Sequence, residues 1–177
     1  MKLRTHYIFS TGLISLVLSL LFRIPFFNIL VISFLISFLG NTIIDRIGHK
    51  EVVTRFGEIP VRTPLTHTFP RSIIWGVISS LPVLVIVLYL SHYYYDYSYY
   101  SNRYETTLVY IISILISGIL VGPSHMVLDV FTEKGIYVKK HGKWRRFALA
   151  HFRYDNPFVN GLAIFFGGIM LYLSYLL

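Results

Sequence analysis

The chain has 177 residues, of which 55% are hydrophobic and only 14% are charged, and its mean hydropathy is +0.63. Soluble domains carry roughly 25% charged residues, so this composition excludes an ordinary water-soluble fold and favours a protein that uses lipid as its solvent. The absence of cysteine excludes disulfides and thiolate metal sites. The net charge of +8 would suggest nucleic acid in a soluble protein, but here it lies between apolar segments and is expected to set topology and contact lipid headgroups.

Five apolar segments follow one another along the chain, each near the roughly 17–25 residues that a helix needs to cross a hydrocarbon core. They are Tyr7–Phe22, Ile24–Ile44, Ile73–Leu90, Leu108–Leu128 and Phe158–Leu177. We predict an all-α fold, a polytopic transmembrane helical bundle of about five spans that forms one membrane-embedded domain over residues 1–177. The first or the last segment is the one most open to spanning only in part.

Two long polar segments, Asp45–Ser72 and Phe131–Pro157, are predicted to be loops. With five spans they lie on the same side as the N-terminus, and that side holds 14 of the 16 Lys and Arg residues. The positive-inside rule places this side in the cytoplasm of a multi-pass protein of the cell membrane.

Histidines and aspartates gather on this same side. The candidates are His6, Asp45, His49, His67, His125 and Asp129. The orientation rests on Lys and Arg alone, yet of the seven histidines only His92 falls on the other side. Acids and histidines near the ends of membrane helices carry a desolvation cost, which makes them candidates for function.

The spacing of these residues favours a metal site. His125 and Asp129 are four apart, which places them on one face of a helix, and Asp45 and His49 repeat that spacing in reverse. Imidazole and carboxylate are ordinary ligands of zinc and related divalent ions, so all six candidates are predicted ligands, with zinc the expected metal. Asp45 and Asp129 are also candidates for the catalytic general base. The alternative for each His/Asp pair, taken by itself, is that the two side chains form only a structural hydrogen bond at the end of a helix.

Arginines flank the predicted site. Arg62 and Arg71 are candidates for substrate binding, because the guanidinium fork matches phosphate oxygens. The alternative is that these arginines only anchor the chain to anionic lipid and fix its orientation.

Four pieces of the sequence carry a resemblance to a known family. They are Thr5-His6, the segment Leu39–Asp45, the segment Arg62–Thr68 with its threonine-histidine pair, and Ser124–Gly135 (SHMVLDVFTEKG). In this order they resemble the motifs of the YdjM-like inner-membrane proteins and their short archaeal relatives. The resemblance implies a metal-dependent hydrolase. The chain departs from the pattern after the second span, where Ile44 stands for a proline and Ile47 for an aspartate, which makes His49 the weakest of the ligands.

The order of the ligands is also similar to that of zinc-dependent phospholipases C, which implies hydrolysis of a phosphoester by an activated water. The expected function is therefore a membrane-bound metal-dependent hydrolase that acts at the cytoplasmic face on a phospholipid or another phosphoester. The alternatives are a membrane scaffold or regulatory protein with a structural His/Asp cluster, and a small transporter, which the lack of mid-membrane charge disfavours. Membrane lipid is the expected partner, and nucleic acid is not expected.

Overall fold

The computed structural model describes residues 1–55, 57–93 and 103–177, and most of them are helical. Five helices in it are long and apolar enough to cross a membrane. They are α1 (Leu3–Leu21), α2 (Phe26–Gly48), α3 (Phe69–Tyr93), α4 (Arg103–Val130) and α5 (Pro157–Leu176). The prediction of a five-span helical bundle is confirmed, and neither the first nor the last segment is shortened.

The helices begin or end beyond the apolar runs that predicted them. Helix α1 begins at Leu3 instead of Tyr7, and α2 continues to Gly48 instead of ending at Ile44. These extra turns matter because His6 and Asp45 then lie inside helices and not in the flanking loops. At α5 the Asn156 side chain caps the helix, since it accepts a hydrogen bond from the backbone N–H of Val159.

Both polar segments predicted as loops contain an antiparallel hairpin. The first consists of β1 (His49–Thr54) and β2 (Gly57–Arg62), with His49 opposite Arg62. The second consists of β3 (Ile136–Lys140) and β4 (Lys143–Phe147), with Ile136 opposite Phe147. Since the facing strands of each hairpin pair their backbone groups with one another, both segments contain regular structure where loops were predicted.

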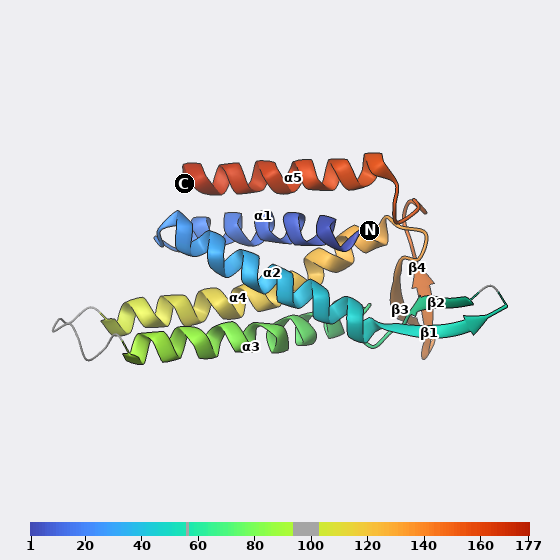
Figure 1. The fold of residues 1–177 in the computed structure, drawn as a ribbon, viewed down its shortest axis with the longest axis horizontal. Coiled ribbons are helices and arrows are strands. Elements are labelled where there is room, and N and C mark those ends of the chain that lie inside the picture. The colour runs from blue at the N-terminus through green and yellow to red at the C-terminus, as the bar shows by residue number, and fades with distance from the viewer. Residues whose placement is uncertain (56, 94–102) are drawn as a thin grey trace.

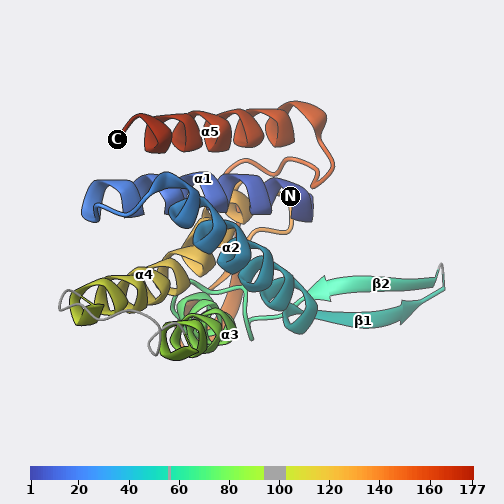
Figure 2. The same ribbon diagram turned by 60° about the vertical axis from the view of Figure 1, so that its left-hand side comes forward.

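The hairpins and the N-terminus lie at one end of the bundle, and the C-terminus lies at the other (Figure 1). Helix α1 packs against α2 and α5, while α4 packs against α3, α2 and α1. Figure 2 shows that α5 and α3 are the outer helices of this arrangement, which leaves α1, α2 and α4 in the middle. These three central helices supply most of the polar residues described below.

Small residues allow the helices to approach closely. A Cβ at Gly12 of α1 would lie 2.1 Å from the carbonyl oxygen of Gly167 in α5. Buried serines in α3 and α4, such as Ser79 and Ser117, return their hydroxyls to carbonyls of the preceding turn. This is the packing expected of membrane helices, where lipid gives no hydrophobic force between them. An apolar core that includes Ile14, Ile36 and Val121 fills the rest of the bundle.

Candidate metal centre

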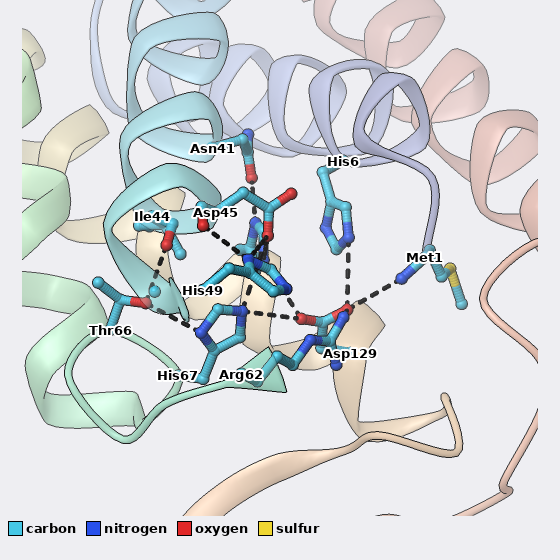
Figure 3. A network of polar contacts seen from close by, with 12 residues as sticks. Met1, His6, Asn41, Ile44, Asp45, His49, Arg62, Thr66, His67 and Asp129 are labelled. Atoms are coloured by element: carbon cyan, nitrogen blue, oxygen red, sulfur yellow. Dashed lines mark hydrogen bonds and ion pairs between the residues drawn. The ribbon is translucent and has the colours of Figure 1, made fainter. Parts of the chain in front are cut away.

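The hairpin end of the bundle holds a buried cluster of imidazoles and carboxylates (Figure 3). Helix α1 brings His6 in its first two turns, α2 brings Asp45 near its end, and α4 brings both His125 and Asp129 in its last two turns. His67 comes from the short segment between β2 and α3. Five of the six predicted ligands thus converge from four parts of the chain.

Asp129 is at the centre of the cluster and is fully buried. Its Oδ1 lies 2.7 Å from Arg62 Nη2, 3.4 Å from His6 Nε2 and 3.0 Å from the Met1 amino nitrogen. Its Oδ2 lies 3.2 Å from His125 Nε2 and 3.8 Å from His67 Nε2. One oxygen is therefore held mainly by cations, and the other faces imidazoles.

Asp45 closes the cluster from α2. Its Oδ1 lies 3.5 Å from His125 Nε2 and 3.7 Å from His67 Nε2. Its side chain is 22% exposed, whereas those of His6, His67, His125 and Asp129 are exposed by 1% or less. Asp45 is thus the member of the cluster that is most open to solvent.

Two groups of three ligands meet the geometry for one ion, with their ligand atoms within 4.8 Å of one another. One group is His6, His125 and Asp129, and the other is Asp45, His67 and His125. His125 belongs to both groups, and its Nε2, the ring nitrogen that faces Asp45 and Asp129, has a single lone pair. The two groups are therefore alternative ligand sets for one ion and cannot both use this nitrogen at the same time.

A second set of contacts fixes the tautomer of His125. The amide nitrogen of Asn41 donates to the carbonyl oxygen of Ser37 at 2.7 Å, which orients the Asn41 oxygen toward His125 Nδ1 at 2.8 Å. His125 Nδ1 must then carry the proton, and the lone pair of Nε2 faces the cluster.

His67 is fixed in the same way. The Thr66 hydroxyl donates to the carbonyl oxygen of Ile44 at 2.9 Å and so accepts from His67 Nδ1, also at 2.9 Å. Its Nε2 lone pair therefore also faces the cluster. Burial lowers the pKa of His67 to about 4, which keeps the ring neutral at physiological pH. A neutral imidazole is the form that binds metals.

These lone pairs face carboxylate oxygens, and such atoms repel one another unless a cation or a proton lies between them. Among the described residues, the buried atoms without a hydrogen-bond partner include His6 Nδ1 and Nε2, Nε2 of His67 and of His125, and Asp129 Oδ2. Buried polar atoms rarely stay unpartnered, so the donor set fits a divalent cation on both chemical and geometric grounds.

The other predicted residues lie beside the cluster. His49 Nδ1 contacts the backbone oxygen of Asp45 at 2.6 Å and lies 3.8 Å from its carboxylate. Arg62 donates to Asp129, to the carbonyl oxygen of Gly135 and to the Thr132 hydroxyl. Arg62 therefore orients Asp129 and ties it to the turn after α4, and its predicted role in binding substrate stays a prediction.

Arg71 lies outside the cluster. Its Nη1 donates to the carbonyl oxygen of Pro64 at 2.9 Å, and its guanidinium stacks on the Trp144 ring at 4.8 Å. These contacts join the start of α3 to β4. The predicted contact of Arg71 with substrate also stays a prediction.

Sequence reasoning missed Asn41, Thr66 and Gly48. An amide four residues before Asp45 within an apolar span was a usable signal for Asn41, because polar groups in membrane helices need partners. A Cβ at Gly48 would lie 2.5 Å from the His67 ring and 2.0 Å from Thr66 Oγ1. Gly48 therefore makes room for His67, which only the folded chain reveals.

The DUF1286 family, described as protein of unknown function, matches residues 1–128. The chain belongs to this family. The matched region holds four of the five clustered residues and ends one position before Asp129. No curated protein and no solved structure matches the chain.

Proposed function

We propose that this DUF1286 protein is a membrane-embedded, metal-dependent hydrolase. The observation that supports it most is the convergence of three imidazoles and two carboxylates on one buried point, with two Nε2 lone pairs oriented by Asn41 and Thr66. Such outer contacts are typical of metal ligands. The resemblance to the YdjM-like proteins points the same way.

Zinc is the metal that we propose, because imidazole nitrogen and carboxylate oxygen are its usual ligands in catalytic sites. A divalent ion held there would supply a Lewis acid and would acidify water. Asp45 is the ligand open to solvent, so it is placed to accept a proton from an incoming water or to leave the ion for the substrate. Asp129 is held by Arg62 and has the more structural role.

The proposed substrate is a phosphoester, and a phospholipid is the form that the membrane offers. Water would form a new bond to phosphorus while the bond between phosphorus and the alcohol oxygen breaks, and the alcohol would leave with one proton of the water. The positive-inside rule supports a cytoplasmic position for the site in the cell membrane, because the hairpin end carries most of the Lys and Arg residues.

A comparison of metal content and hydrolysis tests this proposal. The purified wild type should hold about one ion per chain, because the two candidate ligand groups share His125, and should cleave phosphodiesters. The double variant His125→Ala/Asp129→Ala should do neither. His141→Asn is the matched control, since it removes one histidine from an exposed turn where φ is 51°, a conformation that asparagine tolerates.

The alternative function is a scaffold in which the cluster only holds the helices together. The Arg62–Asp129 ion pair is the contact that favours it. Metal-free wild type with normal folding, or equal metal in the wild type and the double variant, would overturn the hydrolase and leave the scaffold.

A further inference from the structure

The cluster is covered at the end that faces away from the membrane. Arg62, Thr66 and His67 of the segment before α3 are buried over it. The Tyr137 backbone N–H of β3 donates to the His67 carbonyl oxygen at 2.7 Å, and the Tyr137 hydroxyl donates to that of Arg62 at 2.9 Å. A water-soluble substrate that approached along the helix axes would meet this cover.

The opening of the cluster is at Asp45, its partly exposed member, which lies between α2 and the His6 side chain of α1 (Figure 3). These helices diverge toward the hairpin end of the bundle in both views (Figures 1 and 2). Tyr7 reaches across from α1, where its hydroxyl lies 2.7 Å from Thr42 Oγ1 and its ring contacts that of Phe38 at 5.2 Å. Asp45 lies one turn beyond Thr42 on the same face of α2.

Two exposed arginines lie on these same helices, near the hairpin end. Arg4 is one turn before Tyr7 on α1, and Arg46 is one turn after Thr42 on α2. Both helices thus carry a cation on the hairpin side of the Tyr7–Thr42 contact, and Arg46 directly follows Asp45, the partly exposed member of the cluster. Guanidinium groups in this position suit a phosphate.

Apolar side chains continue from the opening toward the middle of the membrane. Ile8 on α1 is 41% exposed, and Phe38 and Phe34 on α2 are 44% and 51% exposed. The two phenylalanine rings stack at 6.3 Å along the helix. Since all three residues lie in membrane-spanning segments, this surface contacts acyl chains.

We propose that an anionic phospholipid reaches the site sideways from the bilayer, between α1 and α2, with its phosphate between Arg4 and Arg46 at Asp45 and its acyl chains along Phe38 and Phe34. This inference rests on the proposed function and names its substrate class. It also explains why Asp45 differs from the other ligands in exposure: it is the ligand that the incoming phosphate meets first.

Phosphorus NMR on the metal-loaded protein tests this route without requiring turnover. The protein is placed in nanodiscs of phosphatidylglycerol and phosphatidylcholine and loaded with Mn²⁺, and unbound ion is removed. The bound Mn²⁺ is counted by electron paramagnetic resonance. Phosphate that reaches the ion shows paramagnetic broadening of its ³¹P line. A second sample carries water-soluble glycerophosphoglycerol in the buffer, with nanodiscs of phosphatidylcholine alone.

The wild type should broaden the phosphatidylglycerol line, and Arg4→Glu/Arg46→Glu should reduce that broadening on the order of tenfold, since each cation near an anionic headgroup contributes about 1 kcal/mol. The matched control Lys140→Glu/Lys143→Glu changes charge equally at an exposed pair of positions on the β3–β4 hairpin. It should broaden the line as the wild type does. The glycerophosphoglycerol line should stay sharp.

Equal broadening by the wild type and Arg4→Glu/Arg46→Glu would overturn the route, and so would a larger loss in the hairpin control. Broadening of glycerophosphoglycerol as strong as that of the lipid would show access from water and would also overturn it. If the double variant does not fold, Arg46→Glu alone gives the same comparison. Samples that hold neither Mn²⁺ nor Zn²⁺ after loading refute the proposed function itself, whereas Mn²⁺-loaded samples without lipid broadening refute only the route.

Discussion

The ends of α2 and α4 carry the same pair of residues at the same spacing and use them differently. At the end of α4, His125 and Asp129 both lie inside the helix, are fully buried and face the cluster. At the end of α2, Asp45 faces the cluster, but the helix ends at Gly48 and His49 already begins β1. His49 therefore turns to the backbone oxygen of Asp45. A four-residue spacing brings two side chains to one site only where the helix continues past both of them.

The largest difference in stability is expected between variants of the two aspartates, Asp129 and Asp45. Asp129→Asn leaves the buried Arg62 without its carboxylate, and removing one partner of a buried pair costs about 3–5 kcal/mol. Asp45→Asn should lower metal content with a much smaller loss of stability, since Asp45 is partly exposed and does not pair with Arg62. Thermal unfolding in detergent together with metal analysis measures both. Equal destabilisation by the two variants would contradict the division of roles drawn here.

Gly48 marks the point where α2 stops. Gly48→Ala places a methyl group against the His67 ring and Thr66, and overpacking of this kind costs about 1–3 kcal/mol. It should also weaken metal binding by displacing His67. Gly161→Ala is the control, because its Cβ would meet no atom within 4 Å. An unchanged metal affinity in Gly48→Ala would mean that His67 is not a ligand.

Asn41 supports the α4 pair through His125. Asn41→Leu removes the acceptor that holds the His125 proton on Nδ1, and loss of such an outer contact lowers metal affinity about 10–100-fold. Competition with a chromogenic chelator measures the change. Ser33→Ala, a buried polar change on the same helix away from the cluster, should leave affinity unaltered, and a similar loss in both variants would point to a general packing effect.

The sequence was sufficient to predict the five spans and to place the histidines and aspartates on one face, because apolar length and positive charge act over whole segments. The departure from the family pattern marked His49 as the weakest ligand, but the sequence was not sufficient to show that His67 lies in the cluster and His49 beside it. That difference depends on where α2 ends and on the β1–β2 hairpin, which carries the chain to His67. The strands of this hairpin were predicted to be a loop because their residues lack the alternation of apolar and polar side chains that marks a half-buried strand. Lys50, Glu51 and Val53 are all exposed in the structure.

The contacts of Arg62 are a second feature that the sequence was not sufficient to predict. Its charge and position predicted contact with substrate, which stays a prediction, but they did not reveal that the fold buries Arg62 against Asp129 and Gly135. An arginine in a polar segment can bind a substrate or form an ion pair with a buried carboxylate of the same chain. Which of the two it contacts depends on the fold.

The free energy of unfolding should decrease at acidic pH because of His67. Its pKa, lowered by burial to about 4 from 6.5, means that the unfolded chain takes up a proton near pH 6.5 that the folded chain does not accept until about pH 4. The metal-free protein should therefore lose stability as the pH falls through this range. The loss should be shallower in His67→Gln. Identical slopes for the two proteins would show that His67 is not held neutral.

The smallest effect on metal binding is expected from a change at His49. His49→Ala removes a side chain that contacts Asp45 but belongs to neither group of candidate ligands. Metal content and affinity should stay at the wild-type level in the same chelator competition. Loss of the metal in this variant would restore His49 as a ligand and would mean that the end of α2 rearranges when the ion binds.

The position of a metal ion in the purified, zinc-supplied protein tests the central claim most directly. X-ray data collected on both sides of the zinc absorption edge should show one anomalous peak within about 2 Å of Nε2 of His125 and of a second imidazole, His6 or His67, the length of a zinc–imidazole bond. A single peak is expected there, beside the carboxylate of Asp129 or Asp45. A cluster without a peak, or a peak at His49 instead, would contradict it.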